Sequence, residues 1–98
     1  MKKAVRSDWQ GAILVCRKCS KKIGGGYGDD GRQPLAKFLK RAMGLGPKRK
    51  SRLGVVEVGC LGICPKRALT VVDTRRPGAW IVLEPGLSAG EVAERLTL

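Results

Sequence analysis

Four cysteines set the strongest constraint on how this chain can fold. They form two tight pairs, Cys16 with Cys19 and Cys60 with Cys64, and the chain has no histidine. Four thiols are the number that fills a tetrahedral metal site or holds a small iron–sulfur cluster. Soft thiolate ligands favour zinc, copper(I) or iron–sulfur. For the four thiols to share one site, the fold has to bring together two pairs that lie far apart in the sequence.

Length and composition indicate one small domain over residues 1–98. The chain is 43% hydrophobic, which is normal for a globular protein and argues against disorder throughout. No apolar run approaches the roughly 18 residues that span a membrane, and the apolar stretch after Met1-Lys2-Lys3 is too short for a signal peptide. We therefore expect a cytoplasmic protein without membrane contact. In that compartment closely spaced cysteines are more often metal-binding or redox-active than disulfide-bonded.

Two apolar strands are expected directly before the cysteine pairs. Ala12–Val15 is a continuous apolar run that ends at Cys16, as a buried parallel strand would. Leu53–Val58 is rich in valine and runs straight into Gly59-Cys60. A strand–helix–strand unit is normally a right-handed crossover with parallel strands. Because parallel strands end at the same edge of the sheet, both cysteine pairs are expected in neighbouring loops at that edge.

The first helix is expected between these two strands. Pro34 suits the first turn. Four apolar residues then follow at helical spacing and give one apolar face: Leu35, Phe38, Leu39 and Ala42. Three basic residues take the opposite face: Lys37, Lys40 and Arg41. We expect residues 20–33, which are rich in glycine, and residues 44–52 to be flexible loops, and residues 1–10 to be a flexible tail.

A hairpin and a second helix are expected in the last third of the chain. The two hairpin strands are Leu69–Val72 and Ala79–Leu83. Trp80 falls in the second strand and is expected in the core. Ser88 and Glu91 have the spacing of a capping box for a helix over residues 89–96. The pattern as a whole predicts an α/β fold in the order β-α-β-β-α, with a small mixed sheet and two helices.

The second cysteine pair lies in a segment that resembles a known family. Gly59-Cys60-Leu61-Gly62-Ile63-Cys64-Pro65, followed by the two hairpin strands and a terminal helix, is similar to the second half of thioredoxin-like [2Fe-2S] ferredoxins. That family includes the small ferredoxin-type subunit of respiratory NADH dehydrogenases and of related hydrogenases and formate dehydrogenases. The first half is similar too, although its cysteines are spaced more closely than is usual in the family. The resemblance implies a thioredoxin-like fold, single-electron transfer and a homodimer. It also implies four ligands for a [2Fe-2S] cluster: Cys16, Cys19, Cys60 and Cys64.

The residues near the cysteines agree with an iron–sulfur site. Each iron of a [2Fe-2S] unit needs two terminal ligands beside the bridging sulfides, so four thiolates are required. Gly59 and Gly62 would let the backbone approach the sulfurs closely and direct N–H groups at them. Six basic residues flank the two pairs and would offset the negative charge of the site: Arg17, Lys18, Lys21, Lys22, Lys66 and Arg67.

Two other kinds of site remain open. A structural zinc ion held by the four cysteines also favours paired cysteines. Alternatively, Cys16 and Cys19 form a dithiol redox pair of the thioredoxin kind, which sits after a strand at the start of a helix. The sequence from Ser20 to Gly25 predicts a poor continuous helix, and the second cysteine pair would have no role, so the dithiol is the less favoured hypothesis.

The net charge points to an acidic partner. The chain has 20 lysines and arginines against 8 acidic residues, a formal charge of +12, and the stretch Lys37–Arg52 contains no acid. Such a surface suits an acidic redox partner protein or nucleic acid. The sequence has no RNP-like aromatic motif that would support nucleic-acid binding. The favoured function is therefore an electron carrier, and the alternative is a zinc-binding module for nucleic acid or protein. With no histidine for acid–base chemistry, an independent enzyme is not expected.

Overall fold

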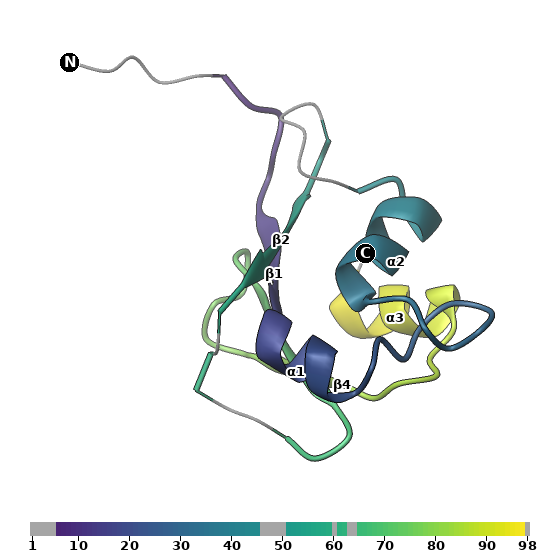
Figure 1. Cartoon of the computed structure of the whole chain (residues 1–98). Coiled ribbons are helices and arrows are strands. Elements are labelled where there is room, and N and C mark those ends of the chain that lie inside the picture. Colours follow the sequence, from purple (N-terminus) through teal and green to yellow (C-terminus); the bar gives the residue numbers. More distant parts are fainter. Residues whose placement is uncertain (1–5, 46–50, 60, 63–64, 98) are drawn as a thin grey trace.

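The computed structural model describes residues 6–45, 51–59, 61–62 and 65–97. Within these residues the chain forms a four-stranded mixed sheet and three helices (Figure 1). The strands are β1 (Ala12–Cys16), β2 (Gly54–Val58), β3 (Leu69–Asp73) and β4 (Ile81–Leu83). The helices are α1 (Arg17–Lys22), α2 (Leu35–Ala42) and α3 (Ala89–Leu96). The predicted α/β class and mixed sheet are confirmed, whereas the expectation of only two helices is wrong, because α1 follows β1 directly.

The sheet has the strand order β2-β1-β3-β4. Strand β1 pairs with β2 in parallel, with Cys16 opposite Val58 at the ends of the two strands. Strand β3 runs antiparallel to β1, and β4 runs antiparallel to β3. Both the predicted parallel pair and the predicted hairpin are therefore present. Because β1 and β2 end at the same edge, the segments that follow them start side by side.

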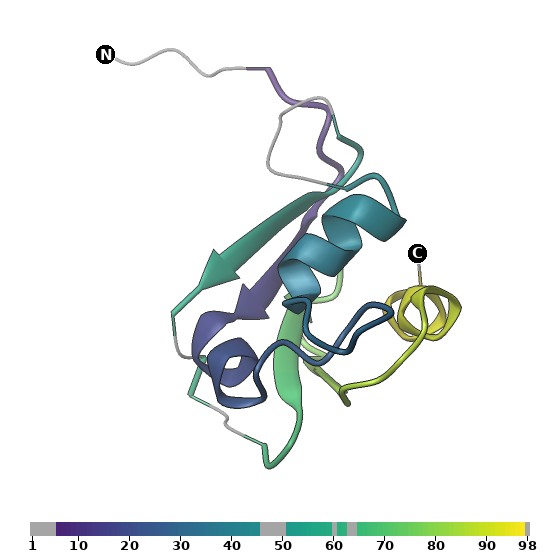
Figure 2. The same ribbon diagram turned by 45° about the vertical axis from the view of Figure 1, so that its right-hand side comes forward.

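The core lies between the sheet and helices α2 and α3, which cover the same face in both views (Figures 1 and 2). Ile13 and Val15 of β1 are fully buried there, in line with the two-residue repeat of a strand. Strand β3 is buried along its whole length. Helix α2 contributes four buried residues: Leu35, Ala36, Phe38 and Leu39. The predicted apolar face was wrong at one position, since Ala42 is exposed and Ala36 is buried in its place.

Proline and glycine set the limits of α2. Pro34 has an extended backbone and is the N-cap residue. The helix therefore begins at Leu35, one residue after the proline that was expected in its first turn. Gly44 has a φ of +64°, a conformation that glycine adopts without steric cost and that ends the helix. Lys37, Lys40 and Arg41 are exposed, as predicted for the basic face.

The capping box of α3 is confirmed. The Ser88 Oγ accepts a hydrogen bond from the Glu91 N–H at 3.2 Å, and the Ser88 N–H donates to the Glu91 carboxylate at 3.1 Å. The helix covers the predicted residues 89–96. Among the residues described, no helix has the length and apolar character needed to cross a membrane.

Trp80 is not a core residue. It lies just before β4 with 44% of its surface exposed, and its indole N–H donates to the Pro77 carbonyl at 3.1 Å. Trp80 lies outside the strand because β4 begins at Ile81 and is shorter than the predicted strand.

Tyr27 attaches the glycine-rich segment to the rest of the molecule. Its side chain is fully buried, its hydroxyl donates to the Leu83 carbonyl at 3.3 Å, and its ring centroid lies 5.9 Å from that of Phe38. Its backbone exchanges two hydrogen bonds with Gln33, at 2.8 and 3.1 Å. The segment therefore packs against both β4 and α2.

Candidate cysteine site

The first cysteine pair lies where β1 passes into α1. Cys16 is the last residue of β1 and the N-cap residue of α1, with extended backbone (φ −68°, ψ 110°). Cys19 lies one turn further on, within the helix. Both residues are buried, with 0% and 2% of their surface exposed. The predicted edge, where β1 and β2 end, is confirmed for this pair. The predicted loop is wrong, because Cys16 ends β1 and Cys19 lies within α1.

Helix α1 forms because its residues separate into an inner and an outer face. Cys19 and Ser20 are buried, and Ile23 packs against the core just after the helix ends. Four basic residues face outward: Arg17, Lys18, Lys21 and Lys22. Lys21 and Lys22 lie in the last turn, where cations interact favourably with the helix dipole. The helix extends only three residues past Cys19 and ends at Lys22, in agreement with the poor continuous helix predicted for residues 20–25. The spacing of Cys19, Ser20 and Ile23 was the sequence signal for the short helix that does form.

The Cys16 thiol has an environment that favours its ionised form. Burial raises the pKa of this thiol. Hydrogen bonds from the backbone N–H groups of Cys19, Leu61 and Lys18, and from the Cys19 thiol, have the opposite effect and together hold the pKa below its ordinary value. A thiolate is the form of cysteine that binds metals and attacks disulfides.

Leu61 links the segment after β2 to the first cysteine pair. Its backbone hydrogen bond to Cys16 joins two residues far apart in the sequence, and its side chain packs against the core. Gly62 has a φ of +90°, so a glycine is required there. Gly59 is not among the glycines with positive φ, and a Cβ at either glycine would meet open space, so the predicted close approach of the backbone is not seen at these positions among the described atoms. Cys60 and Cys64 lie outside the described residues.

The described residues alone do not complete a metal site. Over residues 6–45, 51–59, 61–62 and 65–97, no group of three or more cysteine or acidic side chains is placed to hold a metal ion. This set includes only the first cysteine pair. Asp29 and Asp30, the adjacent acids of the glycine-rich segment, are exposed. The site of four cysteines therefore stays a prediction.

Exposed basic side chains lie both beside the cysteines and far from them. The six that flank the cysteines in sequence are all exposed: Arg17, Lys18, Lys21, Lys22, Lys66 and Arg67. Arg52 is exposed at the other end of the sheet, where its carbonyl accepts a hydrogen bond from the Gln10 N–H just before β1. Lys48, Arg49 and Lys50 lie outside the described residues. Arg52, the last residue of the basic stretch Lys37–Arg52, therefore lies about one strand length from the first cysteine pair. For strands of this size that length is roughly 13 Å.

Comparison of the chain with protein-family models, with curated proteins and with solved structures found no match. The hypothesis of a ferredoxin therefore depends on the residues and the geometry described above.

Proposed function

We propose that this protein is a ferredoxin-like electron carrier in which the four cysteines hold one [2Fe-2S] cluster. The observation that carries the proposal is the parallel register of β1 and β2, which sets Cys16 opposite Val58, two residues before Cys60. The Leu61 backbone, which contributes to the lowered pKa of the Cys16 thiol, agrees with this placement. Leu61 adjoins Cys60 in the sequence, so a contact made by the second cysteine segment reaches the first cysteine pair. Such proximity is what a site shared by both pairs requires.

The described half of the site fits a cluster chemically. Cys16 and Cys19 are buried thiols, and Cys16 receives N–H hydrogen bonds that favour the thiolate. When bound, a [2Fe-2S] cluster supplies a centre that takes up and releases single electrons. Hydrogen bonds to the ligand sulfur and nearby cations stabilise added negative charge, so both raise the reduction potential of such a site. The chain's own contribution is therefore to tune that potential and to exclude water from the sulfurs.

A thioredoxin-like topology and an acidic partner belong to the same proposal. The strand β1 leading into Cys16, the hairpin β3–β4 and the terminal α3 are elements that the family resemblance names, and the parallel pairing of β1 with β2 is compatible with them. Four exposed basic side chains on α1 surround the cysteine edge, where a donor or acceptor protein has to approach. An acidic surface on that protein would bind there and be released by salt. We further propose the homodimer that the resemblance implies.

Serine substitution tests the shared site. If both cysteine pairs hold one cofactor, Cys16→Ser and Cys60→Ser should lose iron to the same extent and lower the thermal midpoint together, because metal binding and folding are linked. Ser20→Ala is the matched control, since Ser20 is buried on the same helix but carries no thiol. Full iron content in Cys16→Ser would contradict the proposal.

The structure also favours a second candidate, a dithiol redox pair formed by Cys16 and Cys19. Cys16 lies at the start of α1. Burial raises the pKa of its thiol, but the hydrogen bonds already described outweigh this effect and lower the pKa. In this function the two thiols join as a disulfide, releasing two electrons and two protons to an oxidised partner disulfide. Iron-free, fully folded protein whose Cys16 is alkylated fastest of the four thiols would favour this function. Stoichiometric zinc would favour the interaction module instead.

A further inference from the structure

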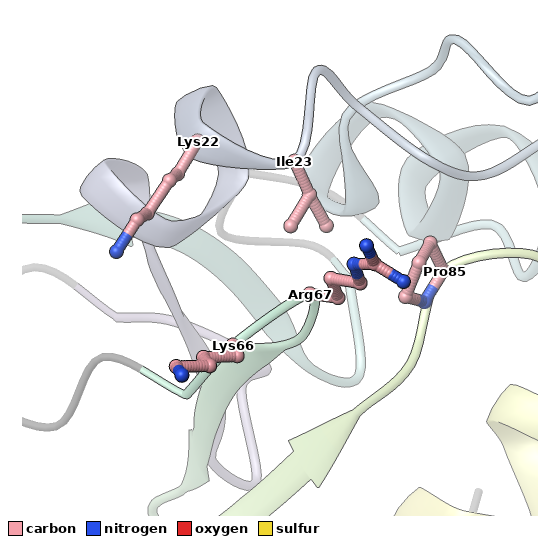
Figure 3. Close-up of a pocket in the computed structure, with 5 residues that line it drawn as sticks. All are labelled: Lys22, Ile23, Lys66, Arg67 and Pro85. Carbon is pink, nitrogen blue, oxygen red and sulfur yellow. The ribbon is translucent and has the colours of Figure 1, made fainter.

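A pocket of about 420 Å³ opens beside α1 (Figure 3). Among the described residues, those that line it are Lys22, Ile23, Lys66, Arg67 and Pro85. They come from three separate parts of the chain, namely the end of α1, the segment before β3 and the segment after β4. The volume falls within the range of about 300–1,000 Å³ that is typical of small-molecule sites.

The lining is strongly cationic. Three of the described lining residues are basic and none of those described is acidic. In the described part of the chain, the recorded ion pairs join Arg75 and Arg76 to Asp73, and neither involves a lining residue. Like charges gathered around a hollow repel one another and raise the local concentration of anions. An anion bound in the pocket would relieve this repulsion.

Arg67 is held in an uncommon backbone conformation. Its φ of +52° lies in the left-handed region, which costs a residue other than glycine about 1–2 kcal/mol. Strain of this kind is found most often where a side chain has to be aimed for binding. In Figure 3 the Arg67 guanidinium lies between Ile23 and Pro85, inside the pocket. A guanidinium presents paired N–H donors that match the oxygens of a phosphate or carboxylate.

We propose that this pocket binds a small organic molecule that carries phosphate or carboxylate groups. Arg67 donates paired hydrogen bonds to one oxyanion, and Lys22 and Lys66 supply the additional positive charge for a multivalent anion. Ile23 and Pro85 contact the apolar part of the ligand. The pocket adjoins the cysteine segments in the sequence, since Lys22 follows Cys19 by three residues and Lys66 follows Cys64 by two. Its ligand is bound by the basic side chains and not by the thiols.

Titration of the full-length protein with two probes tests the proposal. Pyrophosphate and citrate, measured by calorimetry at physiological salt, distinguish phosphate from carboxylate ligands. We expect saturable binding of one molecule per chain for at least one probe. In Arg67→Gln with Lys66→Gln the dissociation constant should rise at least about tenfold, because hydrogen bonds between charged groups are lost. Lys37→Gln with Lys40→Gln is the matched control, which removes the same charge from the outer face of α2 and should bind normally.

The results of the first titrations that would overturn the proposal are as follows. One is the absence of saturable binding of either probe, and the other is equal weakening in both double variants, which would reveal only a general charge effect. A further variant guards against misfolding caused by the unusual backbone of Arg67. Lys22→Gln with Lys66→Gln changes residues outside the left-handed region and should also weaken binding. Normal binding in that folded variant would equally contradict the proposal.

Discussion

The buried Asp73 carboxylate is stabilised by hydrogen bonds from a neighbouring arginine. Asp73 ends β3, is fully buried, and accepts hydrogen bonds from the Arg75 N–H at 2.9 Å and from the Arg75 guanidinium at 2.7 Å. The hydrogen bond from the Arg75 side chain lowers the pKa of Asp73 and outweighs the opposing effect of burial. Arg75 also donates to the Leu96 carbonyl at 3.4 Å, so this group joins the end of β3 to the end of α3.

Replacing this carboxylate should therefore destabilise the protein. We expect Asp73→Asn to lower the free energy of unfolding by about 2 kcal/mol, since hydrogen bonds to a charged group are lost. Because the pKa is lowered on folding, the contribution of Asp73 is complete above its unfolded pKa of about 3.9 and disappears as the pH falls through its folded value. The difference between wild type and variant in urea unfolding should thus shrink below about pH 4. Asp29→Asn, at an exposed position, is the control, and an equal effect of both substitutions would refute this role.

Tyr27 provides a second test at a single residue. Burial, and to a smaller extent the charge of Glu84, raises the pKa of Tyr27 to about 12. The chain has one tyrosine, so the ultraviolet absorbance of tyrosinate reports on it alone. A raised pKa means that the stabilising contribution is complete below the unfolded value of about 10 and is lost as the pH rises towards 12. We expect ionisation near pH 12 together with alkaline unfolding, and a tyrosine that titrates near pH 10 in the folded protein would contradict the buried position.

The element that most depends on backbone geometry is the segment between α1 and α2. Gly25 has a φ of +94°, and a Cβ there would collide with the Arg32 carbonyl. Gly24 has a φ of +68° but faces open space. These adjacent glycines therefore separate the cost of the left-handed conformation from the cost of a collision.

We predict that Gly24→Ala costs about 1 kcal/mol of stability and Gly25→Ala at least about 3 kcal/mol. Gly25→Ala should also displace Tyr27, two residues later, and thereby lower the alkaline pKa of its hydroxyl. Thermal and urea denaturation of the two variants measure the difference. Equal destabilisation would mean that the segment does not hold Arg32 against Gly25 in solution.

Elements with a clear hydrophobic period were predictable, and those that depend on tertiary contacts were not. The strand before Cys16 and the helix over residues 89–96 follow from an apolar run and a capping box. Helix α1 was missed because lysines and a nearby glycine run obscure an inner face made of two cysteines and a serine. Trp80 was misplaced because the length of β4 depends on its pairing with β3, which the sequence pattern does not reveal.

At the scale of the whole molecule, the order of the strands explains what the cysteine motif could predict. The parallel register that sets Cys16 opposite Val58 follows from a strand–helix–strand pattern, so the shared edge was predictable. The cationic pocket was not, because Lys22, Arg67 and Pro85 meet only through the packing of three distant segments. Excess positive charge is visible in the sequence, but which of these basic residues lie near the cysteine edge is known only from the fold.

The content of iron and acid-labile sulfide in protein purified without oxygen tests the central proposal most directly. A shared site of four cysteines predicts about two irons and two sulfides per chain, with a red-brown colour that is lost in Cys16→Ser. Preparation under the same conditions should leave Ser20→Ala with the full content. Protein that is colourless and holds one zinc per chain with no sulfide would contradict the electron-carrier function.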